Sequence, residues 1–364
     1  MNKLPKNWQE YKLKDLCVIN YGKGLGKSNI VNGNIPVYSS GGIIGFHNTY
    51  NVNSEGVIIG RKGNAGSVFY SDKPFFCIDT AFYIEPNNQY DLKYLFYKLV
   101  SMNLKNHKTG TAIPGLIRND IYKLSISIPP LDEQKRIASA LSKIDAYLEN
   151  TIKLIEEKER FKRGIAKKLL TCKEGENIPE ARFKGFEDEW ETKTLNSISN
   201  IKKGEQKNKL DLIADGKYPV LNGGMIFSGY CNSYNREANT ITISEGGNAG
   251  YVNFIKEKFW SSGHCYTLHD LKIDKYFLYQ CLKNSEKRLM KLQLGTALKN
   301  IRQSEIVEFE LNIPKSIKEQ EKIGGYLSLL DAEIDNLKKQ KELIKEMKRG
   351  AMQKLLSGEV RLLE

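Results

Sequence analysis

The lysine- and glycine-rich stretch YGKGLGKS at 21–28 is the strongest candidate for a nucleotide-binding site. It ends in the Gly-Lys-Ser of a phosphate-binding loop, but Tyr21 occupies the position where that loop requires its first glycine. The corresponding stretch in the second half of the chain, KKGEQK at 202–207, keeps a glycine only at Gly204. We therefore interpret both stretches as the glycine-containing ends of strands and expect no bound nucleotide.

Histidine and cysteine residues offer one possible metal site, because His264, Cys265 and His269 lie close together in the sequence. Their counterparts in the first half, around Thr80, lack these ligands. The sequence also has no Asn-Pro-Pro-aromatic motif for amino-methyl transfer, no glycine-rich cofactor fingerprint and no repeated carboxylate–lysine cluster of a nuclease. We expect no metal, no cofactor and no catalysis by this chain alone.

Residues suited to binding phosphate are present in both halves. A basic segment runs into a Gly-Thr turn each time, where backbone amides and a hydroxyl can hold a phosphate while the basic side chains set the affinity. The candidates are Lys105, Lys108, Gly110, Thr111 and Arg118 in the first half, and Lys287, Arg288, Lys291, Gly295, Thr296 and Arg302 in the second.

The sequence Gly-Asn-Ala-Gly also occurs twice, within GRKGNAG at 60–66 and SEGGNAG at 244–250. Both stretches are typical of tight turns between strands, from which side chains can reach base edges. The candidates for base contact are Arg61, Lys62 and Asn64 in the first copy and Asn248 in the second; Lys23, Lys27, Lys203 and Lys207, beside the glycines of the lysine-rich stretches, complete the set. Arg-Lys in the first copy corresponds to Glu-Gly in the second, as expected of two domains that read different sequences.

A longer repeat indicates the elements that must position these residues. Residues 133–171 match residues 319–357 at 16 of 39 positions without a gap, and both copies contain the Lys-Arg-Gly of KRGIAKKLL (162–170) and KRGAMQKLL (348–356). Apolar residues recur at steps of three and four in each copy, and neither contains proline. Each copy predicts one helix about 55–60 Å long at 1.5 Å per residue.

The two predicted helices have matching apolar stripes, so we expect them to pair as an antiparallel coiled coil. The first stripe comprises Ile137, Leu141, Ile144, Leu148 and Ile155, and the second Ile323, Leu327, Leu330, Ile334 and Leu337. Polar residues interrupt these stripes at Thr151, Lys158, Lys162, Lys341 and Lys348, and we expect them to weaken the pairing towards the C-terminal half of each helix.

The segments before the helices repeat more weakly and contain short apolar runs bounded by glycine, such as GVIIG, together with amphipathic stretches. This pattern predicts an α+β fold with two repeated α/β domains separated by two long helices. The predicted boundaries are 1–128 for the first domain, 129–173 for the first helix, 174–313 for the second domain and 314–364 for the second helix.

Composition agrees with a globular protein that has an anionic partner. The chain has 364 residues and a formal charge of +13. Residues 1–128 carry 15 basic and 8 acidic side chains, whereas residues 174–313 carry 19 of each, because acidic residues gather at 174–191. No secretory signal, membrane-spanning run or paired cysteine motif is evident, so we expect a cytoplasmic protein without membrane contact.

The whole chain resembles the specificity (S) subunit of a type I restriction-modification system. The resemblance rests on IPPLDEQKRIASALSKID with KRGIAKKLL, and on IPKSIKEQEKIGGYLSLLD with KRGAMQKLL, which are similar to the two helical regions of that family. It implies two target-recognition domains that each read one half of a bipartite sequence in double-stranded DNA. It also implies a subunit without a cofactor that docks two methyltransferase subunits, to which restriction/translocase subunits are added.

Two other functions stay open at this point. A coiled-coil adaptor between proteins would have the helices without DNA reading, and binding to duplex DNA with a steep salt dependence would distinguish it from the specificity subunit. A fused methyltransferase or nuclease would need the catalytic motifs that the sequence lacks. S-adenosylmethionine binding by the chain alone would reveal such an enzyme.

Overall fold

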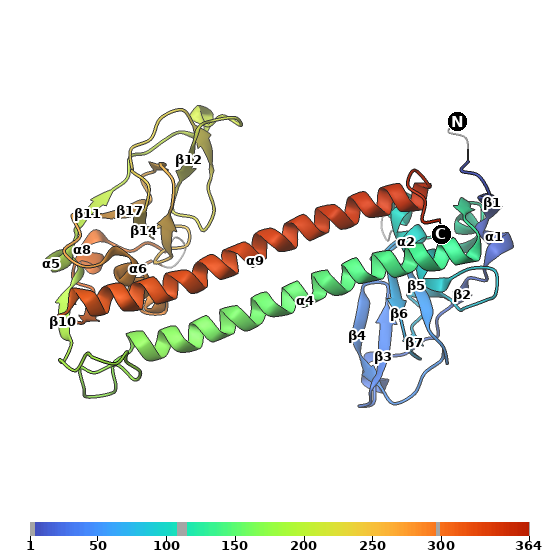
Figure 1. The fold of residues 1–364 in the computed structure, drawn as a ribbon, viewed down its shortest axis with the longest axis horizontal. Helices are drawn as coiled ribbons and strands as arrows, with labels where there is room; N and C mark the ends of the chain where they lie inside the picture. The colour runs from blue at the N-terminus through green and yellow to red at the C-terminus, as the bar shows by residue number, and fades with distance from the viewer. Residues whose placement is uncertain (1–3, 108–114, 296–298, 364) are drawn as a thin grey trace. The chain divides into compact units, whose positions relative to one another are not determined.

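The computed structural model describes residues 4–107, 115–295 and 299–363 and divides the chain into two compact units (Figure 1). Unit 1 comprises residues 1–152 and 339–364, and unit 2 comprises residues 153–338. Each unit therefore takes part of both long helices. Among the described residues, no helix combines the length and apolarity needed to cross a membrane.

Unit 1 contains two small sheets and a pair of strands. The four-stranded sheet has the order β2-β8-β5-β6, and its neighbouring strands are all antiparallel. The three-stranded sheet has the order β4-β3-β7, and β1 pairs with β9. The strands are β1 (Gln9–Lys12), β2 (Asn20–Tyr21), β3 (Ile35–Ser39), β4 (Gly42–His47), β5 (Gly56–Gly60), β6 (Val68–Ser71), β7 (Phe76–Cys77), β8 (Ala81–Ile84) and β9 (Ser125–Ile128).

Unit 2 repeats this topology strand by strand. Its sheets have the orders β11-β17-β14-β15 and β13-β12-β16, and β10 pairs with β18. The strands are β10 (Glu191–Thr194), β11 (Asn200–Lys203), β12 (Tyr218–Leu221), β13 (Gly229–Cys231), β14 (Thr240–Ser244), β15 (Val252–Ile255), β16 (Trp260–Ser261), β17 (Cys265–His269) and β18 (Glu310–Ile313). The predicted α+β class with two repeated domains is confirmed.

Shorter helices accompany these sheets in matching places. Unit 1 has α1 (Leu13–Leu16), η1 (Lys27–Asn29), α2 (Leu92–Ser101), η2 (Leu104–His107) and α3 (Arg118–Tyr122). Unit 2 has α5 (Leu195–Ile198), η3 (Lys209–Asp211), α6 (Lys275–Asn284), α7 (Glu286–Met290) and α8 (Gln303–Val307). The helical segments before the two Gly-Thr sequences are each broken in two, at Asn103 with φ 47° and at Ser285, which ends α6 and begins α7.

The long helices are α4 (Leu131–Leu170) and α9 (Ile317–Ser357), which begin shortly after Pro129 and Pro314. Their apolar stripes, however, do not serve helix pairing throughout. Ile137 and Leu141 belong to the core of unit 1, and Ile323 and Leu327 belong to the core of unit 2. The first turns of each helix therefore pack against a sheet-containing domain, which leaves less of each stripe for helix pairing.

Ion pairs join the two helices where the sequence predicted a weak seam. In unit 2, Lys162 Nζ lies 2.6 Å from Asp331 Oδ1, and Lys158 Nζ lies 2.7 Å from Glu333 Oε2. In unit 1, Lys348 Nζ lies 2.5 Å from Asp145 Oδ1. In unit 2, Lys162 lies later in α4 than Lys158 but contacts an earlier residue of α9; in unit 1, Tyr147 lies later in α4 than Asp145 but contacts Gln340, which is earlier than Lys348. The helices are therefore antiparallel. Lys158, Lys162 and Lys348 thus each have a carboxylate partner on the other helix, which their place in an apolar stripe did not indicate, whereas Lys341 pairs with Glu342 on its own helix.

The repeated Glu-Gln at the start of both helices has a structural role. Gln134 Oε1 accepts the Asp91 N–H at 2.9 Å, and its amide donates to the Pro129 carbonyl. Gln320 accepts the Asp274 N–H in the same way. Asp91 and Asp274 cap the N-termini of α2 and α6, so each glutamine fixes a capped helix against a long helix.

Candidate nucleic-acid interface

The Gly-Asn-Ala-Gly loop of unit 1 connects β5 to β6 and meets two other segments. Gly63 and Gly66 have φ values of 72° and 84°, which favour glycine. A Cβ on Gly66 would lie 2.5 Å from the backbone nitrogen of Lys105 in η2, so that position also requires close backbone approach. The backbone after the Gly-Thr turn returns to the same loop, because the Leu116 N–H donates to the Arg61 carbonyl at 2.8 Å.

Unit 2 builds the same junction between β14 and β15. Gly247 and Gly250 have φ values of 72° and 86°, and a Cβ on Gly250 would lie 2.8 Å from the Met290 nitrogen at the end of α7. The Ile301 N–H donates to the Glu245 carbonyl at 2.9 Å, as Leu116 does to Arg61. The repeated glycines are therefore explained by backbone geometry, and the residues that differ between the copies lie on a common scaffold.

Two arginines and a tyrosine gather beside the junction of unit 1. The Cζ atoms of Arg61 and Arg118 lie 5.0 and 4.7 Å from the centre of the Tyr21 ring. Arg61 donates to the Asp79 carbonyl at 3.2 Å, and Arg118 donates to the Ile19 carbonyl at 3.4 Å. Tyr21 is 46% exposed, so this cluster presents positive charge and an aromatic ring at the surface.

The corresponding place in unit 2 holds an internal ion pair. Lys203 Nζ lies 2.6 Å from Glu245 Oε1, and the Tyr266 hydroxyl donates to the same carboxylate at 2.9 Å. Burial raises the pKa of Glu245, but the hydrogen bonds from Lys203 and Tyr266 lower it, so the net pKa lies below the ordinary value. His264 Nδ1 also lies 3.5 Å from this carboxylate.

The other residues of unit 1 that were predicted to contact DNA lie on the junction loop or on separate segments. Lys62 pairs through its backbone with Gly115, while Lys62 and Asn64 are exposed in the loop. Lys105 is exposed in η2, and Lys23 is exposed beyond β2, where its backbone pairs with Ile78. Lys27 begins η1. Lys108, Gly110 and Thr111 lie outside the described residues.

In unit 2, Lys207 lies over the Trp260 ring, with Nζ 3.8 Å from the ring centre. Arg288 packs over Phe309 and donates to the Glu310 carbonyl at 3.2 Å. The remaining described candidates are Asn248, Lys287, Lys291, Gly295 and Arg302, all of which are exposed. Asn248 donates its backbone N–H to the Gly223 carbonyl, and Gly295 has φ 98°. Thr296 lies outside the described residues.

Arg118 and Arg302, which follow the two turns in the sequence, do not occupy equivalent positions. Arg118 is the first residue of α3, whereas Arg302 precedes α8 as its N-cap. The residue equivalent to Arg118 is Gln303, whose amide donates to the Ile201 carbonyl at 3.0 Å as Arg118 does to Ile19. Sequence reasoning also missed Tyr21 as a binding candidate. Its position next to Gly22 and Lys23 in an aromatic–basic stretch was the available signal.

The lysine-rich stretch at 21–28 does not form a phosphate-binding loop. Its residues end β2 and form the short helix η1, so no long helix follows the glycines. A Cβ on Gly22 would lie 2.0 Å from the Ile78 carbonyl oxygen, and one on Gly204 would lie 2.2 Å from that of Ser262. Both glycines therefore allow a close backbone approach. No group of three or more potential metal ligands occurs within the part of the chain that the structure describes.

Comparisons with known proteins agree with this architecture. The family model for the type I restriction modification DNA specificity domain matches twice, at residues 5–157 and 187–346. A type I specificity subunit of Mycoplasma pneumoniae is 40% identical over 151 residues, which cover 41% of this chain and 40% of the relative. Another specificity subunit, from Mycoplasma genitalium, is matched over 45% of its length, so the chain spans less than half of either relative in these alignments.

Two further comparisons extend over most of the chain. The MjaVIII specificity subunit of Methanocaldococcus jannaschii is 28% identical over 342 residues, which cover 85% of this chain and 80% of the relative. The crystal structure of an S subunit from M. genitalium has the same fold, with a TM-score of 0.75, 23% identity and 97% of each chain covered. Because the family model matches most of the sequence in two copies, the chain belongs to the type I restriction modification DNA specificity domain family.

Proposed function

We propose that this chain is the DNA-specificity subunit of a type I restriction-modification complex and that each unit reads one half of a bipartite target in double-stranded DNA. The observation that carries the proposal is the loop junction, which has the same backbone in both units and different side chains at equivalent positions, such as Lys62 and Gly246. A scaffold that stays constant while its exposed residues change is suited to reading two different sequences.

The candidate contacts divide into two groups. Lys62, Asn64 and Asn248 lie on the exposed loops and are assigned to base edges. Lys105, Lys287, Arg288 and Lys291 precede the Gly-Thr turns and are assigned to phosphates. Lys108, Gly110, Thr111 and Thr296 remain predicted phosphate contacts, together with Gly295. The recognition domains are assigned to residues 1–128 and 174–313, and the helical regions to 129–173 and 314–364.

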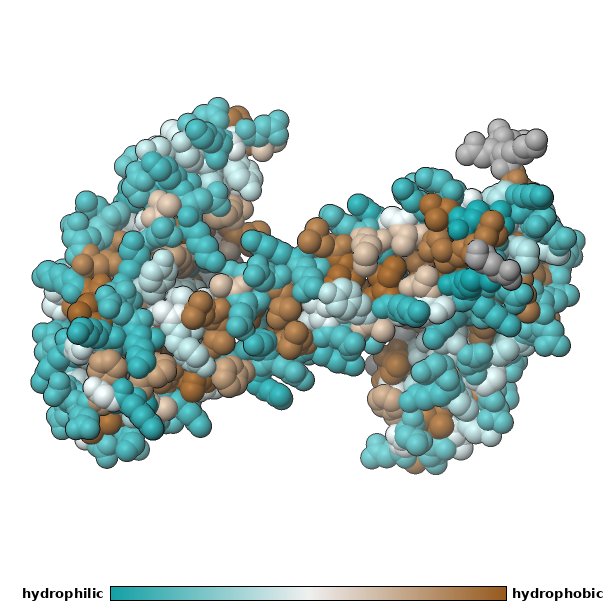
Figure 2. Space-filling model, viewed as in Figure 1, coloured by the Kyte–Doolittle hydropathy of each residue, from teal (hydrophilic) through white to brown (hydrophobic). Residues whose placement is uncertain are grey.

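Methyl transfer, ATP hydrolysis and DNA cleavage are assigned to partner subunits, namely two methyltransferase subunits and the restriction/translocase subunits. The two methyltransferase subunits would dock at equivalent places on α4 and α9. Phe161 precedes one Lys-Arg-Gly motif and Met347 precedes the other, and these apolar side chains are 53% and 50% exposed. Figure 2 shows apolar side chains among the polar ones along α9. Equivalent exposed apolar positions, one in each unit, are suited to two copies of one partner.

Methylation mapping tests this function directly. Genomic DNA from cells with and without the gene is compared, and the expected result is loss of one methylated bipartite motif in its absence. Mixing the purified chain with its methyltransferase subunit should restore methylation of that motif, while neither protein alone should methylate it. An unchanged set of methylated motifs would contradict the proposal, and methylation by the chain alone would favour an enzyme.

A further inference from the structure

The strand registers establish which residues of the two junctions are equivalent. Tyr21 pairs with Phe82, and Lys203 pairs with Tyr266. Phe82 and Tyr266 each pair on their other side with the isoleucine two residues before the loop, in β5 and β14. Tyr21 is therefore the counterpart of Lys203. Arg61 is likewise the counterpart of Glu245, because each donates its backbone N–H to the matching carbonyl, that of Thr80 or His264.

The cluster in unit 1 concentrates positive charge without neutralising it. In the described part of the chain, no ion pair joins Arg61 or Arg118 to a carboxylate, and both guanidinium groups donate to backbone carbonyls. Their Cζ atoms lie 5.0 and 4.7 Å from the centre of the same Tyr21 ring, so the two cations are close to each other. Two cations held this close repel each other, and an anion placed beside them would remove that cost.

The equivalent residues of unit 2 neutralise each other. Glu245 takes the place of Arg61 and binds Lys203, and its side chain is largely buried. Gln303 takes the place of Arg118, so the second guanidinium is replaced by a neutral amide. An anion approaching this place would meet a lysine that is already paired, Lys203, and the negatively charged carboxylate of Glu245.

We propose that Arg61, Tyr21 and Arg118 form a phosphate-binding site for the DNA backbone, and that the equivalent site in unit 2 is closed by Glu245. This inference rests on the proposed function. The arginine forks and the tyrosine hydroxyl supply the donors that phosphate oxygens accept. Unit 1 therefore holds the DNA backbone at this position, whereas unit 2 binds DNA phosphates through other groups, such as Lys207 beside Trp260.

The experiment measures the salt dependence of DNA binding by the full chain in complex with its methyltransferase subunit. Fluorescence anisotropy is recorded between 50 and 200 mM salt on a duplex with the mapped target and on one without it. The slope of log affinity against log salt is negative, and Arg61→Ala and Arg118→Ala should each reduce its magnitude by about 0.9 and weaken binding to both duplexes by the same factor. Glu245→Gln, which frees Lys203 but keeps a hydrogen-bond acceptor, should increase the magnitude of the slope by about 0.9.

Arg61→Gln and Arg118→Gln keep a donor for the backbone carbonyls and replace the alanine variants if thermal unfolding shows those to be misfolded. An unchanged slope in the arginine variants, or a loss confined to one base position, would overturn the phosphate site. An unchanged slope in Glu245→Gln would overturn the closed site of unit 2. Failure of the wild-type complex to prefer its target would instead refute the proposed function, so the two failures are distinguishable.

Discussion

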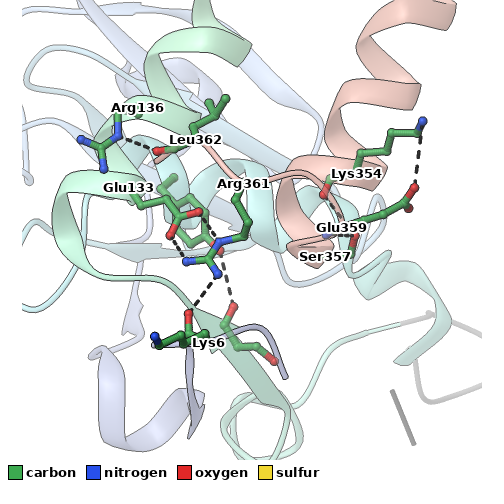
Figure 3. A network of polar contacts seen from close by, with 10 residues as sticks. Lys6, Glu133, Arg136, Lys354, Ser357, Glu359, Arg361 and Leu362 are labelled. Atoms are coloured by element: carbon green, nitrogen blue, oxygen red, sulfur yellow. Dashed lines mark hydrogen bonds and ion pairs between the residues drawn. The ribbon is translucent and has the colours of Figure 1, made fainter. Parts of the chain in front are cut away.

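The guanidinium group of Arg361 binds the carboxylate of Glu133 through two hydrogen bonds of 2.7 and 2.8 Å (Figure 3). The same guanidinium donates to the Lys6 carbonyl at 2.9 Å, so one residue joins the segment after α9, the start of α4 and the N-terminal segment of unit 1. Unit 2 repeats this arrangement with Arg182 and Glu319, at 2.8 Å for both hydrogen bonds. The glutamate at the start of each long helix therefore binds an arginine in the segment that follows the other long helix.

Arg361→Ala should destabilise unit 1 strongly, because the Glu133 side chain is 2% exposed and would lose its partner. A buried charge left unpaired costs about 3–5 kcal/mol, and solvent reaching the vacated space would reduce this towards the lower limit. Urea unfolding of the full chain measures the change. Lys123→Ala is the matched control, because its partner Asp120 is at the surface and such pairs contribute at most about 1 kcal/mol. Equal effects of the two variants would show that the buried pair contributes no more than an exposed one.

The stabilisation from this pair should depend on pH in a defined direction. Hydrogen bonds from Arg361 hold the pKa of Glu133 below its ordinary value of 4.5, although burial opposes them. The folded state therefore favours the ionised carboxylate, and its contribution is fully present above pH 4.5 and is lost as the pH falls through the folded pKa. The difference in unfolding free energy between wild type and Arg361→Ala should be largest near pH 7 and shrink below pH 4.5. A difference that stays constant from pH 7 to pH 3.5 would contradict this linkage.

The sequence predicted the long helices, the repeated domains and the glycine turns, because these features follow from local periodicity and backbone conformation. It did not indicate the ion-pair partners of Lys162 and Lys348, since a lysine in an apolar stripe gives no sign of a carboxylate on another helix. Identical residues at Asp145 and Asp331, repeated at the same offset as the lysines, were the signal that could have indicated the ion pairs.

The candidate site was predictable only as a set of segments. The cluster at Tyr21 depends on how three segments far apart in the sequence approach, and this approach is fixed by sheet register and by glycines that admit close backbone contact. The repeated turn also suggested that Arg118 and Arg302 are equivalent. Gln303 is the counterpart instead, because it lies eight residues after Gly295, as Arg118 lies eight residues after Gly110, and each begins its helix.

The interhelical ion pairs should contribute to stability in both units. The Lys162 side chain is 15% exposed and the Asp331 side chain is 32% exposed. Gln280 also donates to the Asp331 carboxylate at 2.8 Å. A double-mutant cycle with Lys162→Met and Asp331→Asn should give a coupling energy of about 1–3 kcal/mol. The cycle at the exposed pair of Lys256 and Asp335 is the control, for which about 0–1 kcal/mol is expected. No coupling at Lys162 would show that the pair is a geometric contact without energetic effect.

Phe161 and Met347 should each support one methyltransferase subunit. Replacing either by Asp places a charge where an apolar contact is proposed, so each single variant should bind one partner copy and the double variant should bind neither. Native mass spectrometry of the mixed proteins counts the copies. Leu210→Asp is the control, because Leu210 is 96% exposed and lies outside the long helices. Two bound copies in the double variant would place the docking surface elsewhere.

Exchanging the loop residues should change one half of the DNA target and leave the other unchanged. Arg61 and Lys62 correspond to Glu245 and Gly246, and the glycines that follow have nearly equal φ values in both units, so the loop of unit 2 should fit the backbone of unit 1. The variant Lys62→Gly leaves Arg61 in place and removes the exposed loop cation that can donate to guanine O6 or N7. Methylation mapping in cells that carry the variant should show a changed or lost preference at one half-site and the original sequence at the other. Asn248→Ala is the matched test in unit 2, because Asn248 is exposed on the equivalent loop, and it should affect the other half-site. If either variant alters both half-sites together, the two units do not read DNA independently.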